Sequence, residues 1–303
     1  MEMDYGLTNA LLEKHGTSYD FSMSLNNQTL RVHLLSQFDP NVMGNSFPAL
    51  SIRVVDTKLL PYEELNLPSL FKRAANLRRG LFLVSGHTAS GKSTTVATLM
   101  NIINTSSSDR LTILTIEDPV EYIHKSSSAK IIQKSVGINT PSFKQATEDA
   151  LRENVDIVMI GELRGPEEMD NALRLAETGK MVIATVHANS VADTVERIIN
   201  EFPGDVQDNY RARLSENIVG ILHQNLEIYN GSQYPVVHGF LVENASDQSE
   251  MRKGMHNREK LASLMKNEGF SWVVTHKKAF TELNEKVKFK DVEEARKRFV
   301  VNL

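Results

Sequence analysis

The stretch Gly86-His87-Thr88-Ala89-Ser90-Gly91-Lys92-Ser93 decides how the central part of this chain folds. It fits the pattern G-x-x-x-x-G-K-[ST] without a mismatch, and the apolar run Leu81–Ser85 precedes it. In this pattern the glycines let backbone N–H groups curl around phosphate oxygens, and the following helix directs its positive end at the same anion. The sequence therefore predicts a strand, a phosphate-binding loop and a helix in succession.

The residue types in this loop indicate a nucleoside triphosphate with its metal ion. Lys92 is expected to reach the β- and γ-phosphates, and the Ser93 hydroxyl to ligate Mg²⁺. The alternative, a glycine-rich turn with a chance Lys-Ser, is disfavoured because the predicted strand and helix flank the motif in register. ATP and Mg²⁺ are the predicted cofactors. The predicted nucleotide-binding residues are Gly86, His87, Thr88, Ala89, Ser90, Gly91, Lys92, Ser93 and Thr94.

Apolar runs and amphipathic segments alternate on the C-terminal side of Gly80, which is typical of an α/β domain with a mostly parallel sheet. The expected strands are Leu81–Ser85, Leu111–Glu117, Asp156–Gly161 and Met181–His187. Helix signals lie between them. These are a capping-box pair at Ser142 and Gln145, Pro166 at a first helical position with Gly179 as the stop, and the pair Ser190 and Asp193 at the start of another helix.

The first sixty residues have a different pattern, with short strands expected at Tyr19–Leu25, Thr29–Leu35 and Ala49–Val55. Two prolines mark Pro61–Pro68 as a linker. We therefore expect a small α+β domain over residues 1–65 and an α/β domain over residues 66–303. The tail from about Asn257 to Leu303 is helical in propensity and densely charged, which favours solvated helix faces.

Composition limits the function classes. Hydrophobic residues at 41% and charged residues at 24% are ordinary for a folded soluble protein. No apolar run approaches the roughly 18 residues of a membrane span, and the chain has no cysteine, which excludes disulfides and Cys-ligated metal sites. A net charge of −4 disfavours nucleic acid as a general partner. A cytoplasmic location fits these features.

Acidic residues and one histidine follow three of the predicted strands, at the edge where open α/β sheets bind ligands. Glu117, Asp118 and Glu121 follow the second strand, as residues that orient or deprotonate water or as solvent-facing loop acids. Glu162 ends the third strand in the Walker-B manner, which suits Mg²⁺ or its waters. His187 ends the fourth strand, as a structural residue or as a γ-phosphate sensor.

Taken in order, these motifs resemble the secretion ATPase superfamily of type II and type IV systems, and most of all the PilT-like retraction ATPases of type IV pili. The resemblance runs from about Asp20 to about Leu226. Its further carriers are Asp20-Phe21-Ser22, Leu30-Arg31-Val32, Ile52-Arg53, Glu64–Pro68, Arg79-Gly80, Ile113–His124, Ala150-Leu151-Arg152, Gly161-Glu162-Leu163-Arg164, Ala176–Gly179 and Thr185-Val186-His187.

The resemblance implies a RecA-like P-loop NTPase domain preceded by a PAS-like N-terminal domain. It implies that Glu121 activates water, that Glu162 manages Mg²⁺ and that His187 contacts the γ-phosphate region. Arginines from the N-terminal domain and its junction approach a neighbour's phosphates in this family, which makes Arg31, Arg53 and Arg79 candidates. Surface ion pairing is the alternative for each arginine.

The resemblance also implies a homohexameric ring at the cytoplasmic face of the inner membrane, attached through a pilus platform protein. Mg-ATP hydrolysis would then power pilus retraction. The nearest alternative is the same motor in a type IV secretion, conjugation or competence system. A monomeric P-loop kinase for a small molecule and a nucleic-acid motor are rivals from other classes.

Several positions depart from the family pattern. What precedes Glu64 is about half the usual N-terminal domain, so we expect this domain to be shortened. Lys180 stands where many relatives have the first histidine of the His box, Gly165 replaces a usual Asp, and Asn154-Val155 replaces a usual Asp-Pro. The Ala-Ile-Arg-Asn-Leu-Ile-Arg-Glu helix of the retraction subclass is not found. The absence of cysteine argues against the assembly subclass with its four-cysteine zinc site.

Overall fold

The structure is a computed structural model of the 303-residue chain. It describes residues 18–25, 28–38, 46–55, 69–106, 110–229, 232–242 and 272–275, with residues 41, 59, 62 and 249. The chain divides into two compact units. The first comprises residues up to Lys58 together with Asp118–Ile123, and the second comprises Leu59–Glu117 and the chain from His124 onward.

The described part of the first unit is an antiparallel sheet in the order β1–β2–β3. Its strands are β1 (Ser18–Leu25), β2 (Gln28–Phe38) and β3 (Ser46–Val55), which confirms the three strands expected from the sequence. Because side chains alternate across a strand, the register Phe21–Val32–Ile52 lies on an apolar face. The helices that an α+β domain requires would fall outside the described residues.

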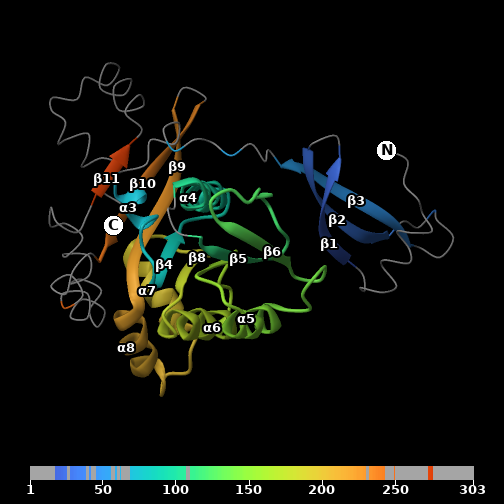
Figure 1. The fold of residues 1–303 in the computed structure, drawn as a ribbon. Coiled ribbons are helices and arrows are strands. Elements are labelled where there is room, and N and C mark those ends of the chain that lie inside the picture. The colour runs from blue at the N-terminus through green and yellow to red at the C-terminus, as the bar shows by residue number, and fades with distance from the viewer. Residues whose placement is uncertain are drawn as a thin grey trace. The chain divides into compact units, whose positions relative to one another are not determined.

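The second unit is built on a sheet whose described strands have the order β11–β10–β9–β4–β8–β7–β5–β6 (Figure 1). The six strands from β9 to β6 run parallel, and β10 and β11 pair antiparallel. Their bounds are β4 (Gly80–Ser85), β5 (Thr112–Glu117), β6 (Lys130–Ser135), β7 (Ile157–Ile160), β8 (Met181–Val186), β9 (Ile218–Tyr229), β10 (Ser232–Leu241) and β11 (Trp272–Thr275). The predicted α/β fold with a mostly parallel sheet is confirmed.

Helices cover both faces of this sheet, which explains why its central strands are apolar on both sides. The helices are α3 (Ser69–Ala74), α4 (Lys92–Ser106), α5 (Phe143–Arg152), α6 (Pro166–Glu177), α7 (Val191–Asn200) and α8 (Gln207–Asn217). On β4, Phe82 and Val84 pack in one core with α3 and α4, whereas Leu81 and Leu83 pack in the other with α5 to α8. Figure 1 shows α4 and the pair α5 and α6 on opposite sides of the strands.

The helix boundaries follow from local chemistry, with one correction. Ser142 Oγ accepts from Gln145 N at 3.1 Å, but the Gln145 side chain donates to Asp149 Oδ1 at 2.9 Å, so only half of the expected capping box forms. Pro166 is the first residue of α6, and Gly179 after its end has φ +86°, as expected. The prediction of a helical tail is wrong at Trp272–Thr275, which forms strand β11. The rest of the tail lies outside the described residues.

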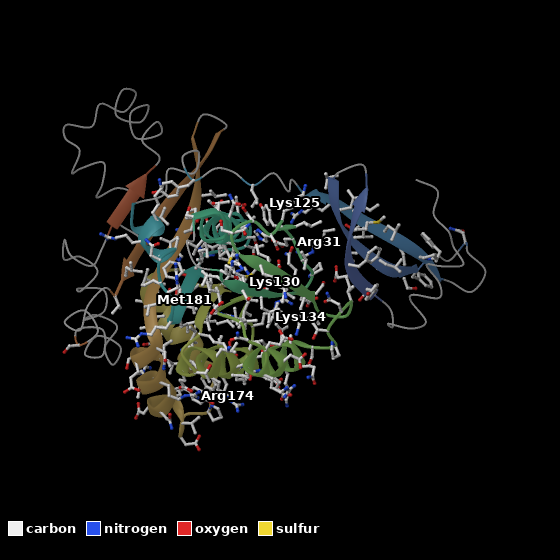
Figure 2. All side chains as sticks on the ribbon, in the orientation of Figure 1. Arg31, Lys125, Lys130, Lys134, Arg174 and Met181 are labelled. Atoms are coloured by element: carbon white, nitrogen blue, oxygen red, sulfur yellow. The ribbon has the colours of Figure 1, made fainter. Side chains whose placement is uncertain are left out.

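The edge strand β6 carries the lysines that natural sheets use to discourage pairing with other chains. Figure 2 shows Lys130 and Lys134 on this strand. Lys134 Nζ contacts Glu153 Oε1 at 2.9 Å and Asp149 Oδ2 at 3.4 Å, so it also ties β6 to the end of α5. The far edge of the parallel set is closed by the antiparallel strands β10 and β11.

The N-cap of α7 gives a testable contribution to stability. Ser190 Oγ accepts from Asp193 N at 3.0 Å. We expect Ser190→Ala to lower the free energy of unfolding by about 1 kcal/mol, because a first-turn amide loses its acceptor. Ser190→Thr retains a hydroxyl and should stay closer to the parent protein. Urea unfolding followed by far-UV circular dichroism measures both variants, and an Ser190→Ala protein as stable as the parent would contradict the assignment.

Candidate phosphate-binding site

The loop between β4 and α4 needs glycine at two positions. Gly86 has φ +151° and Gly91 has φ +85°, and Ala89 between them is a non-glycine residue at φ +61°. A Cβ on Gly86 would lie 2.1 Å from the carbonyl oxygen of Gln224 on β9, a distance no side chain tolerates. Left-handed residues among right-handed ones turn successive amides toward one side, which is how a backbone nest for anions forms.

Lys92 closes this loop from its helical end. Its side chain is buried, and Nζ donates to the carbonyl oxygens of Gly86 at 2.9 Å and His87 at 2.7 Å. The ammonium therefore sits over the start of the loop, while its own backbone begins α4. The helix macrodipole and the lysine charge both favour an anion at this place.

The loop residues fit a polyphosphate. Ser90 Oγ is buried and has no hydrogen-bond partner among the described residues. The first amides of α4 have no acceptor within the helix itself, and Ser93 in its first turn is exposed. No cluster of three or more acidic or histidine side chains forms a metal cage in the described ranges. Mg²⁺ typically takes one or two protein ligands together with phosphate oxygens and waters, so a site with the predicted donors Ser93 and Glu162 needs no such cluster.

Glu162 and His187, predicted from separate strands, lie in contact. Glu162 follows β7 and His187 follows β8, and His187 Nε2 lies 2.7 Å from Glu162 Oε1. Arg164 Nε donates to the other carboxylate oxygen at 2.7 Å. Burial, followed by the positive charge of Lys92, lowers the pKa of His187 below its ordinary value of 6.5, while Glu162 acts in the opposite direction. Lys92, Glu162 and His187 therefore share one electrostatic environment.

One side chain that the sequence did not single out holds both ends of the acidic segment after β5. Gln133 on β6 donates from Nε2 to Glu117 Oε1 at 3.4 Å and accepts at Oε1 from His124 N at 2.9 Å. Glu117 is buried and also accepts from Thr115 Oγ1 at 2.7 Å. Glu117 is thus a buried anchor rather than a loop acid, whereas Asp118 is exposed. Only the parallel pairing of β5 with β6 could have revealed Gln133.

Glu121 lies in the part of the chain that belongs to the first unit, next to one of the candidate arginines. Arg31 Nη1 donates to Glu121 Oε1 at 3.2 Å, and both side chains are about one-third exposed, at 34% and 32%. Arg53 is paired in register with Arg31 across β2 and β3 and is exposed. Two arginines directly opposite each other destabilise a sheet, so their positions favour an anionic partner. The role of Glu121 in activating water stays a prediction.

Two basic residues lie at the N-terminal ends of the parallel strands, whereas the phosphate loop lies at their C-terminal ends. Arg79 is exposed and immediately precedes β4, whereas the phosphate loop follows β4. A six-residue strand spans about 20 Å, so Arg79 cannot reach the loop of its own chain. Lys180, just before β8, donates from Nζ to the carbonyl oxygens of Val155 at 2.9 Å and Glu153 at 3.4 Å. It is therefore a structural cap of the α5–β7 turn.

The strand, glycine loop and helix on a largely parallel, helix-covered sheet define a P-loop nucleotide-binding domain. The family described as Type II/IV secretion system protein matches residues 21–297. The chain belongs to this family. Among the described residues, no helix combines the length and the apolarity needed to cross a membrane.

The relatives found by sequence and structure point to one branch of the family. A twitching motility protein of Neisseria gonorrhoeae is 37% identical over 236 residues, which are 77% of this chain and 61% of that protein. The type IV pilus retraction ATPase PilT of Pseudomonas aeruginosa is 40% identical over 174 residues, 57% of this chain and 50% of the relative. The chain therefore spans only 50% to 61% of the length of these relatives.

A solved structure supports the same resemblance. The crystal structure of the pilus retraction motor PilT with bound ADP superposes with a TM-score of 0.75 at 31% identity. The superposition covers 88% of this chain and 74% of that one. The predicted resemblance to PilT-like proteins is thereby confirmed.

The electrostatic coupling of the site is testable through His187. Lys92→Ala should raise the pKa of His187, because it removes a neighbouring positive charge, and Glu162→Gln should lower it further. Because the folded-state pKa lies below the unfolded value, this residue's contribution to stability is present above about pH 6.5 and is lost as the pH falls. Imidazole chemical shifts followed by NMR over a pH series measure each pKa.

His124 is the internal control for this titration. Its pKa is also lowered, but by burial alone, so it should not change in either variant. The shared electrostatic environment of Lys92, Glu162 and His187 would be contradicted if the pKa of His187 did not change in either variant. It would also be contradicted if the pKa values of His187 and His124 changed together.

Proposed function

We propose that this protein is an ATPase that binds Mg-ATP through the loop Gly86–Ser93 and hydrolyses it in composite sites of a homohexameric ring. The observation that carries the proposal is the contact of Glu162 with His187 at the sheet edge, within the electrostatic reach of Lys92. A phosphate loop accompanied by an acid and a histidine suits a nucleoside triphosphate, with its γ-phosphate, better than a nucleoside monophosphate. The ADP bound to the similar PilT structure supports nucleotide binding.

The chain's own residues divide the chemistry between them. Lys92 and the loop amides would bind the phosphates. Ser93 and Glu162 would hold Mg²⁺, which neutralises charge on the β- and γ-phosphate oxygens when bound. His187, kept neutral by its lowered pKa, can donate or accept a hydrogen bond at the γ-phosphate without adding a charge. Glu121 would orient and deprotonate the attacking water.

Arginines from a neighbouring subunit would complete each site. Arg31 and Arg53 stand opposite each other on the polar face of the first unit, and Arg79 lies a strand length from its own loop. Arg79 is therefore placed to serve the phosphates of another subunit, and we propose the same role for Arg31 and Arg53. An arginine supplied in trans is worth about 10³–10⁵ in rate in related phosphoryl transfer.

The machine that this motor serves is proposed from its relatives. The twitching motility protein and the PilT ATPase favour pilus retraction. We propose that the ring acts at the cytoplasmic face of the inner membrane, attached through a pilus platform protein. The alternative is a type IV secretion, conjugation or competence system. Co-purification with a pilus platform protein supports retraction, and co-purification with secretion-core proteins instead would reject it.

Two substitutions separate binding from turnover. Lys92→Ala should abolish detectable ATP binding, because the buried ammonium that spans the loop is lost. Glu121→Gln should leave ATP affinity near that of the parent and lower turnover by about 10²–10⁴-fold, the usual contribution of a general base. Isothermal titration calorimetry and phosphate release measure the two effects, with Asp118→Asn as the matched control in the same segment. Parent-like turnover in Glu121→Gln would remove this residue from the mechanism.

Mixing two inactive variants tests the composite site. Arg53→Ala retains its own phosphate loop, and Lys92→Ala retains Arg53, so a mixed ring contains some complete sites if the arginine acts in trans. We expect each variant alone to have little ATPase activity and the mixture to recover part of the parent rate. A mixture no more active than its components would mean that Arg53 does not serve a neighbour.

A further inference from the structure

Gln224 on β9 packs against the phosphate loop and donates a hydrogen bond to it, although nothing in the sequence motif requires this residue. Ser85, the last residue of β4, pairs with His223 in the parallel register of β4 and β9. Gln224 is therefore the first residue of β9 beyond the end of β4, beside the loop. Its side chain is buried, with 3% of its surface exposed.

Both ends of the Gln224 carboxamide are engaged. Nε2 donates to the carbonyl oxygen of Ser90 at 2.7 Å, and Oε1 accepts from Thr95 Oγ1 at 2.6 Å. Thr95 lies in the first turns of α4 and is itself buried. One side chain therefore connects the Ser90 carbonyl group in the loop to the helix that follows the loop.

The loop sequence is adapted to this close approach. A Cβ on Gly91 would lie 2.7 Å from Gln224 Nε2, and a Cβ on Gly86 would lie 2.1 Å from Gln224 O. The absence of a side chain at Gly91 thus leaves room for the Gln224 carboxamide, whereas the absence of one at Gly86 leaves room for the backbone carbonyl of residue 224. The Gln224 side chain is therefore closely packed against the loop.

The hydrogen bond to Ser90 O has a consequence for anion binding. In a trans peptide the carbonyl and the next N–H point in opposite directions. Holding the Ser90 carbonyl toward Gln224 therefore turns the Gly91 N–H to the other side, away from β9. We propose that Gln224 is a positioning residue that presets the Ser90–Gly91 peptide for phosphate binding.

This inference rests on the proposed function, since it concerns the same nucleotide site. Gln224 does not contact the phosphates through this geometry; it acts through the peptide it holds. Loss of the side chain should weaken the binding of ground state and transition state alike, which raises KM and leaves kcat nearly unchanged.

The test is a set of ADP dissociation constants measured by isothermal titration calorimetry on the full chain. Gln224→Leu removes both hydrogen bonds and should weaken ADP binding by about tenfold or more. Thr95→Val releases only the far end of the carboxamide and should weaken it less. The double variant should bind ADP no more weakly than Gln224→Leu, because the two residues act through one contact. Additive losses in the double variant would overturn the inference.

Asn104 supplies the matched control at the other end of α4. It is a buried carboxamide that donates to Lys125 O at 2.8 Å and accepts from Ser127 N at 2.9 Å, far along the helix from the loop. Asn104→Leu should lower the melting temperature as Gln224→Leu does, yet keep the parent affinity for ADP and the parent KM. Equal weakening in both variants would reduce the Gln224 effect to general destabilisation.

A second variant covers the case in which Gln224→Leu does not fold. Gln224→Glu keeps an acceptor for Thr95 and loses the donor to Ser90 O, and it should weaken ADP binding at least as much. Parent-like ADP binding by either Gln224 variant would overturn this inference alone, provided that the parent binds ADP and Lys92→Ala does not. Failure of the parent itself to bind nucleotide would instead overturn the proposed function.

Discussion

Amide hydrogens can face a phosphate only if the neighbouring carbonyl oxygens are turned the other way and satisfied there, and the site depends on this constraint. In the loop after β4, the carbonyls of Gly86 and His87 accept from Lys92, and that of Ser90 accepts from Gln224. The left-handed conformations of Gly86, Ala89 and Gly91 allow these turns. The loop is thereby shaped by a lysine from the helix and an amide from β9, rather than by the glycines alone.

The same edge of the sheet balances its charges over several strands. Burial, and after it the charges of Lys92 and Arg164, lower the pKa of His187, and Glu162 opposes them while contacting both His187 and Arg164. A neutral histidine adds no second positive charge beside Lys92 at the anion site. Because β7 and β8 are adjacent and parallel, their carboxyl ends bring Glu162 and His187 together.

Local chemistry made the helix ends and the phosphate loop predictable from the sequence. Ser190, Pro166 and Gly179 mark helix ends by their own hydrogen-bonding or conformational preferences, and the P-loop carries its flanking strand and helix with it. Non-local contacts were not predictable. Gln133 and Gln224 acquire their roles only from strand pairing, and a glutamine in a strand has no distinctive spacing. The partner of Gln145 was not predictable either, because its side chain donates to Asp149 instead of completing the capping box.

The distribution of arginines supports the proposal that each site takes residues from two chains. Arg79 lies at the N-terminal end of the strand whose C-terminal end carries the phosphate loop, so a strand length separates them within the chain. Arg31 and Arg53 face each other across β2 and β3, where like charges raise the free energy of the folded sheet unless an anion lies nearby. Glu121 offsets part of this charge at Arg31, at 3.2 Å. The proposed action of these arginines on a neighbouring subunit's phosphates would supply the remaining anionic charge.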